Sequence, residues 1–180
     1  FGLLQNKLNT SLKFGTQSNN LDGSKPTTTT RLIYDIQSSW SDKKLNVQTN
    51  YSNNSSNVTY VLNQQLDSLN AAIVTQDLGV NVSYTLPFKG PHQHVLSLNG
   101  NMQDVSDDIE KSVQTTSSKL FLANVSYLFK TESKWTFTIR VNYNQNEIQG
   151  ISVNRTGFGG GFKKEFFSGK LSLGSNVNYF

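Results

Sequence analysis

Apolar and polar residues alternate along most of the chain with a repeat of two. From Trp135 to Tyr143 every second residue is aromatic or aliphatic, and the residues between them are polar. The segments 121–129, 78–86 and 44–51 alternate in the same way, and weaker versions occupy 4–14, 32–40, 94–102, 158–166 and 171–179. A period of two predicts β-strands with two unlike faces, and a helical period fits none of these segments better. The pattern therefore predicts an all-β chain with nine or ten strands.

The connections between these segments are alternately short and long. Short ones are expected at 41–44, 87–92, 131–134 and 167–169, and long polar ones at 16–27, 52–57, 103–118 and 144–155. Their Pro, Gly, Asn and Ser residues are ordinary turn chemistry. The stretch from Val58 to Asn70 fits either a further full strand or a hairpin standing above the sheet. We favour a hairpin extension over 53–70, because it preserves the alternation of short and long connections.

Strands of about ten residues, with short turns at one end and long loops at the other, are the layout of a transmembrane β-barrel. In a barrel, one face of each strand meets lipid and the other meets a wet lumen. We therefore expect an antiparallel up-and-down meander that forms all or part of a barrel, with residues 1–180 as one domain or a portion of one.

The composition agrees with strands of this kind. Of the 180 residues 35% are hydrophobic and only 16% are charged, and Asn, Ser and Thr fill the polar faces. A soluble domain carries about 25% charged residues. No run of 18 apolar residues exists, which excludes a transmembrane helix, and the absence of Cys excludes disulfides and thiol chemistry.

Aromatic residues fall near the expected strand ends, where an interfacial girdle would lie. The predicted girdle consists of Trp40, Tyr51, Phe88, Phe129, Trp135, Tyr143 and Phe166. Charge also divides between the two ends. The short turns and their flanks hold eight Lys against three acidic residues, whereas the long connections hold three basic residues against seven acidic ones. The two ends are expected to face different compartments.

The sequence resembles bacterial outer-membrane β-barrels, and in composition those of the Bacteroidota. The segments that carry the resemblance are Leu120–Lys130 and Trp135–Tyr143, joined by Thr131–Lys134, together with the glycine-studded strand Gly157–Phe162. The resemblance implies an outer-membrane location with short turns in the periplasm and long loops outside. It also implies contact with outer-membrane lipid and lipopolysaccharide, and it allows other subunits of an outer-membrane complex as partners.

Two features suggest a segment of a larger barrel. Barrels of this kind usually end in an aromatic residue that is preceded by apolar residues at every second position. Counting back from Phe180, every second residue is instead Asn or Gly, and the apolar residues lie at the positions between them. Nine strands would also be an odd number, whereas single-chain bacterial barrels have even numbers. Both features fit a longer barrel, of which these residues form a part.

Three charged residues lie within expected strands. Arg31 and Asp35 share the polar face of one segment, and Arg140 lies on the polar face of another. A charge facing lipid at mid-membrane would cost about 2–4 kcal/mol, so we expect all three to face the lumen. They would serve either as structural ion pairs or in solute selectivity.

The sequence offers little catalytic or metal-binding chemistry. His92 and His94 could share a strand face, but no Cys, Asp or Glu lies within nine residues of them. The acidic run from Asp104 to Glu110 lacks the pattern of a calcium loop, and no nucleophile elbow occurs. The three Arg are far apart and no basic run exceeds two residues, so nucleic acid is not an expected partner. We expect no enzyme activity, no metal and no cofactor.

Two functions from different classes remain. The first is a section of an outer-membrane barrel that acts as a pore or transporter wall, or as the membrane anchor of a larger complex. The alternative is a secreted soluble all-β binding or adhesin module, whose apolar faces would lie in a dry core.

Overall fold

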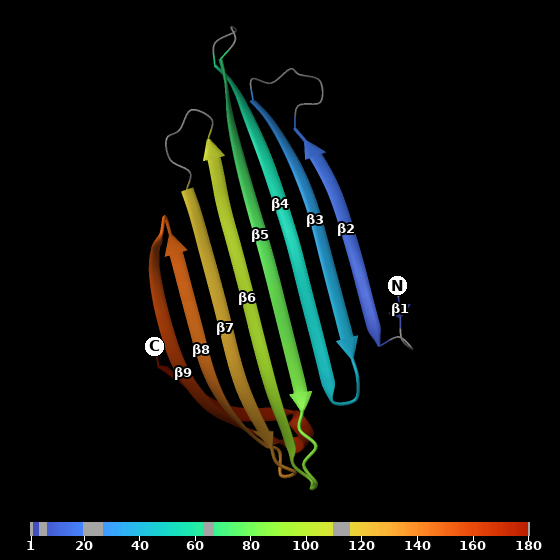
Figure 1. Ribbon diagram of the computed structural model, residues 1–180. Coiled ribbons are helices and arrows are strands. Elements are labelled where there is room, and N and C mark those ends of the chain that lie inside the picture. The colour runs from blue at the N-terminus through green and yellow to red at the C-terminus, as the bar shows by residue number, and fades with distance from the viewer. Residues whose placement is uncertain (1, 4–6, 20–26, 63–66, 110–115, 180) are drawn as a thin grey trace.

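The chain forms a single antiparallel sheet in which every strand pairs with its neighbours in the sequence (Figure 1). The computed structural model describes residues 2–3, 7–19, 27–62, 67–109 and 116–179. The strands are β1 (Gly2–Leu3), β2 (Leu8–Ser18), β3 (Thr27–Ser41), β4 (Leu45–Leu62), β5 (Asp67–Thr85), β6 (Gln93–Ile109), β7 (Thr116–Lys130), β8 (Trp135–Ile148), β9 (Ile151–Phe166) and β10 (Leu171–Tyr179). The predicted up-and-down meander is confirmed, with nine long strands preceded by a two-residue strand.

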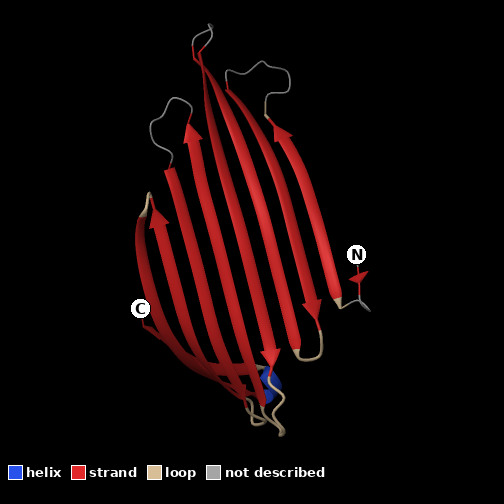
Figure 2. Cartoon of the chain, viewed as in Figure 1, coloured by secondary structure: helices blue, strands red, loops and turns tan. Residues whose placement is uncertain are grey.

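Helical structure in the described part is limited to one 3₁₀ turn, η1 (Phe167–Gly169), which joins β9 to β10 (Figure 2). None of the described helical residues belongs to a helix long and apolar enough to span a membrane. The sheet is open in this structure, because β1 and β10 lie at its two edges and do not pair with each other.

The four short turns lie at one end of the sheet. They occupy residues 42–44, 86–92, 131–134 and 167–170, as the sequence predicted. In the first, the Asp42 amide donates to the Leu45 carbonyl at 2.8 Å, and the Lys7 ammonium lies 3.0 Å from the Asp42 carboxylate. The backbone amide of Lys43 and then the Lys7 ammonium hold the pKa of Asp42 below its usual value. These contacts close a tight turn on an exposed rim.

The other end differs from the sequence expectation, because strands occupy most of the expected long loops. Residues 52–57 lie inside β4, and β6 continues to Ile109. The loop expected at 144–155 is a two-residue turn, in which Gln149 has φ 52° and Gly150 has φ 80°. Two successive positive φ angles are the geometry of the hairpin turn that matches strand twist. Asn, Ser and Thr alternate well enough to continue a strand whose two faces are both polar.

The proposed hairpin extension over 53–70 lies in the distal parts of β4 and β5. These strands have 18 and 19 residues and rise beyond their neighbours at the loop end (Figure 1). Their ladder continues to the pair Leu62 and Asp67. Residues 63–66 between them lie outside the described part of the chain.

The sheet has no covering layer among the described residues. No described hydrophobic residue is buried, and large apolar side chains such as Phe14 and Ile139 are 75% and 63% exposed. A water-soluble sandwich would bury such side chains between two sheets. The apolar face therefore has to meet another apolar medium.

Close approach between β9 and β10 makes Gly174 sensitive to any side chain. A Cβ added there would lie 2.5 Å from the Phe162 carbonyl oxygen and 3.1 Å from the Lys163 Cα. We expect Gly174→Ala to lower the free energy of unfolding by about 1–3 kcal/mol, the usual range for overpacking. Urea unfolding in detergent micelles, followed by tryptophan fluorescence, measures it.

Gly100→Ala is the matched control, because nothing lies within 4 Å of a Cβ at that position. Equal stability of the two variants would contradict the close approach.

Candidate functional site

One face of the sheet is largely apolar from strand to strand, with a row of hydroxyl residues, Thr10, Ser38 and Thr49, on β2, β3 and β4. Residues directly opposite each other in an antiparallel ladder share a face, so the register extends the face of Trp135 and Tyr143 from strand to strand. Its aliphatic and aromatic members include Leu12, Ile36, Val47, Val82, Leu98, Val125, Ile139, Phe162 and Leu173. Nine residues from Trp135 to Tyr143 span about 26 Å at about 3.3 Å per residue. That length suits a tilted membrane-spanning strand.

The same face turns polar at a defined level toward the loop end. On β2 to β9 the polar residues at this border are Thr16, Thr30, Asn53, Gln76, Asp104, Lys119, Gln145 and Thr156. Asn53 lies opposite Gln76, Gln76 lies opposite Asp104, and Asp104 lies opposite Lys119, with its carboxylate 3.9 Å from the ammonium. An apolar band with a sharp polar border is the signature of a surface that enters a hydrocarbon layer.

An aromatic row marks this border. The last apolar residue before it is aromatic on five strands, namely Phe14, Tyr51, Phe121, Tyr143 and Phe158, and Tyr34 on β3 lies opposite Phe14. Neighbours in the row are in ring contact: the centroids of Tyr34 and Tyr51 are 6.3 Å apart, and those of Phe121 and Tyr143 are 6.1 Å apart. Of these residues only Tyr51 and Tyr143 belong to the predicted girdle.

A second aromatic cluster lies at the turn end of the same face. It contains the remaining predicted girdle residues Trp40, Phe88, Phe129, Trp135 and Phe166, together with Tyr84, His94 and Tyr127. The His94 ring lies 4.9 Å from Phe129 and 4.7 Å from Phe88, and its Nδ1 is hydrogen-bonded to the Tyr127 hydroxyl at 2.6 Å. Trp135 stacks on Phe137 at 6.0 Å, with the Lys164 ammonium 5.1 Å from the Trp135 ring. Aromatic and cationic side chains of this kind fit a membrane interface.

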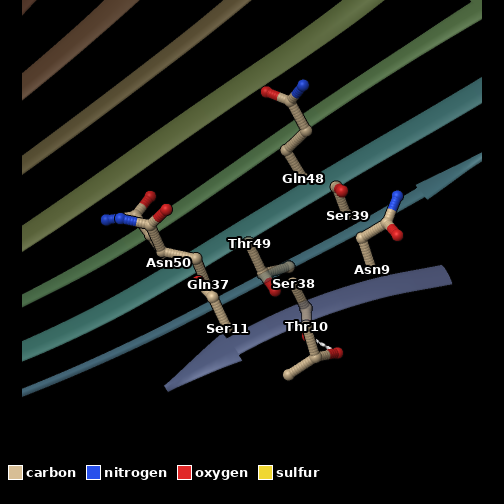
Figure 3. Close-up of a pocket in the computed structure, with 9 residues that line it drawn as sticks. All are labelled: Asn9, Thr10, Ser11, Gln37, Ser38, Ser39, Gln48, Thr49 and Asn50. Atoms are coloured by element: carbon tan, nitrogen blue, oxygen red, sulfur yellow. Dashed lines mark hydrogen bonds between the residues drawn. The ribbon is translucent and has the colours of Figure 1, made fainter. Parts of the chain in front are cut away.

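The opposite face is polar and largely uncharged. Four asparagines stand opposite one another on adjacent strands, Asn81 to Asn99 to Asn124 to Asn142. The Asn124 amide donates to the Asn142 side-chain oxygen. A hydrophilic hollow of about 520 Å³ lies on this face over β2, β3 and β4 (Figure 3). Amide and hydroxyl side chains of the polar face border it, those of Asn9, Ser11, Gln37, Ser39, Gln48 and Asn50, and its lining also includes Thr10, Ser38 and Thr49, which the register assigns to the opposite face.

The three predicted strand charges all lie on this polar face. Arg31 and Asp35 project from β3 and Arg140 from β8, and the register joins their face across the sheet. Asp35 forms its ion pair with Lys13 on β2, at 3.7 Å, and accepts a hydrogen bond from Gln37 at 3.1 Å. Arg31 instead lines a hollow with Gln17, Asn19 and Thr29.

The structure also places the other titratable candidates. His92 lies in the short turn before β6, with its ring 5.5 Å from Phe129, so both histidines belong to the aromatic cluster. Among the described residues no group of three or more His, Asp or Glu is arranged to hold a metal ion. Asp104, Asp107 and Asp108 extend along β6 instead of gathering in a loop. Phe180, the predicted terminal aromatic, lies outside the described residues.

Sequence reasoning missed the aromatic row members Phe14, Tyr34, Phe121 and Phe158 and the cation Lys13. The aromatic residues were assigned to strands, but their common level follows only from the ladder register. Lys13 and Asp35 stand directly opposite on β2 and β3. The signal available in the sequence was the change from apolar to polar residues at the same parity, such as Tyr51 to Asn53 and Phe121 to Lys119.

An antiparallel meander with one apolar, aromatic-bordered face and one polar face defines a wall of a transmembrane β-barrel. Residues 25–180 match the model of the outer membrane protein beta-barrel family, and the chain belongs to that family. The protein is therefore an outer-membrane β-barrel protein, and the alternative of a secreted soluble module is set aside.

A solved structure shares the fold, and a second was found at a lower score. The unliganded ferric citrate transporter FecA superposes with a TM-score of 0.58 at 10% identity over 95% of this chain, and the alcaligin outer-membrane receptor FauA of Bordetella pertussis gives 0.36 at 11% over 88%. This chain spans 33% of the length of each. No curated protein matches the sequence.

A lipid-facing role for the apolar face predicts a large effect at Ile139. In water an exposed isoleucine tolerates lysine, but in the hydrocarbon layer we expect Ile139→Lys to cost about 2–4 kcal/mol. The free energy of unfolding from lipid vesicles measures this difference.

Thr138→Lys is the control, because Thr138 is adjacent in sequence and lies on the polar face. A small effect of both substitutions would contradict the assignment of the lipid-facing surface.

Proposed function

We propose that this chain forms a section of the wall of an outer-membrane transport barrel, with its polar face lining the solute pathway and no catalytic step. The observation that carries the proposal is the difference between the two faces of one uncovered sheet. The polar face offers rows of amides and hydroxyls to water, whereas the apolar face is bordered by two aromatic levels. A membrane anchor would need the apolar face but not a continuous hydrophilic one.

The open edges of the sheet support a section of a larger wall. Strand β1 pairs with β2 only through Gly2 and Leu3, so most of the outer side of β2 has no partner among the described residues. Strand β10 pairs on one side only, with β9. An unpaired backbone group in lipid costs several kcal/mol, so both edges would need further antiparallel partners in the membrane.

We propose the turn end as the periplasmic end and the long loops as extracellular. Lysines concentrate at the turn end, at Lys43, Lys44, Lys89, Lys130, Lys134, Lys163, Lys164 and Lys170. The strands extend beyond the apolar band at the other end, where the outer part of β4 begins with Asn53, Asn54, Ser55, Ser56 and Asn57. Outer-membrane lipid would contact the apolar band, lipopolysaccharide would contact the polar border above it, and other subunits of an outer-membrane complex would be further partners.

The orientation is testable because the chain contains no cysteine. Single cysteines at Gln149 and Lys89 lie at opposite ends of the sheet. On intact cells we expect a membrane-impermeant maleimide to label Gln149→Cys and to label Lys89→Cys only after the outer membrane is permeabilised. Labelling in the reverse order would overturn the proposed orientation.

Solute passage is testable with bulky residues on the two faces. Ser126 and Val125 are adjacent on β7 and face opposite sides, Ser126 toward the polar face and Val125 toward the apolar band. We expect Ser126→Trp to reduce solute flux into liposomes that carry the intact protein, because the indole would obstruct the polar pathway. Val125→Trp should leave flux near the wild-type value.

Folding of both variants is checked by heat-modifiable migration in gels. Equal flux through Ser126→Trp, Val125→Trp and the wild type would contradict a pathway along the polar face, as would flux no greater than in empty liposomes.

A further inference from the structure

A second hollow on the polar face, at the turn end of β6, β7 and β8, is cationic. It has a volume of about 470 Å³. Its lining carries two basic side chains, Lys130 and Arg140, and four hydroxyls, those of Ser97, Ser126, Thr136 and Thr138. No carboxylate belongs to the lining. This composition differs from the neutral hollow over β2 to β4.

Neither cation forms an ion pair within the described part of the chain, although Lys163 first and then Lys130 lower the pKa of the nearby Glu165 carboxyl. The ion pairs there join Lys7 to Asp42, Lys13 to Asp35, Lys119 to Asp104 and Lys163 to Glu165. Glu165, on the same face as the hollow, is engaged by the Lys163 ammonium at 3.1 Å. Arg140 is therefore not one half of a structural ion pair among these residues, unlike Asp35.

The strand beside Arg140 leaves space for a ligand. Arg140 stands opposite Gly159, and Thr138 stands opposite Gly161, so β9 projects no side chain toward the hollow at either level. The next strand places the side-chain amides of Asn178 and Asn176 over these two glycines. The flank of Arg140 is thus backbone and neutral amide.

The two cations are spaced along the strands. Lys130 lies opposite Thr136, four residues before Arg140 on β8, which separates the two backbone levels by about 13 Å. Both side chains border the same hollow, so a ligand with two anionic groups fits better than a single small ion. The guanidinium fork binds carboxylate or phosphate through two parallel hydrogen bonds, and the lysine adds a point charge.

We propose that this hollow is a binding site for small solutes with two or more carboxylate or phosphate groups, on the wall of the pathway. The proposal rests on the proposed function, because it takes the polar face as the solute-facing surface. Ser97, Ser126, Thr136 and Thr138 would donate to the remaining anion oxygens.

Isothermal titration of the full chain in an uncharged detergent tests the site, with inorganic pyrophosphate and tricarballylate as the phosphate and carboxylate probes. We expect saturable binding of at least one probe, weakened by added salt. Arg140→Gln and Lys130→Gln should each weaken binding at least tenfold, and Arg140→Lys less than Arg140→Gln.

Arg155→Gln and Lys13→Gln are the matched controls, because both residues lie on the polar face outside the hollow. Their affinity should equal that of the wild type. On the wild-type protein, a saturating probe should also protect Lys130 but not Lys13 from acetylation, which keeps the test independent of variant folding.

Absence of binding to both probes, unchanged affinity in the Arg140 and Lys130 variants, or equal acetylation of Lys130 with and without probe would each overturn the site. If Ser126→Trp reduces flux but the wild-type protein binds neither probe, the anion site is rejected and the proposed function is not. Anion binding without any flux difference between the two tryptophan variants rejects the pathway instead.

Discussion

The structure depends on one constraint: a backbone placed in hydrocarbon finds no water, so each amide and carbonyl needs a partner within the sheet. The meander satisfies this need for β3 to β9, which pair with sequence neighbours on both sides, and leaves it open along the outer sides of β2 and β10. Stability then comes from lipid contact along the apolar face and does not require a protein core. That is why side chains such as Leu12 and Phe14 stay exposed across a well-ordered sheet.

Under this constraint, the length of a strand also does not have to equal the thickness of the membrane. Within the hydrocarbon layer one face of each strand has to be apolar, and the segment from Trp135 to Tyr143 meets this requirement. Beyond the border at Asn53 and Gln76 both faces meet water, and the ladder continues because hydrogen bonding between strands does not depend on side-chain polarity. Strands of up to 19 residues are the result. The aromatic row lies where the two regimes meet, since its rings tolerate both media.

The sequence predicted the parts of the fold that follow from side-chain parity. The two faces of 135–143 and 121–129 and the short turns needed only alternation and turn residues. Strand extent needed more, because residues 52–57 are all Asn or Ser, with no alternation of apolar and polar residues to reveal the strand. The turn at Gln149 and Gly150 was hidden in a polar segment for the same reason. Relations between strands, such as the pair of Lys13 with Asp35 and the common level of Phe14 and Tyr34, require the register, which a single sequence does not contain.

The polar face does not have to match the lipid. Its few charged side chains therefore indicate function more clearly than its many amides do. The row from Asn81 to Asn142 is neutral toward water, and within it Asn124 donates a hydrogen bond to Asn142. Against this background, Asp35 is balanced by Lys13, whereas Arg140 has no such partner among the described residues. An uncompensated guanidinium beside bare glycine backbone gains nothing for the sheet itself. The position of Arg140 therefore fits contact with a solute better than a structural role within the sheet.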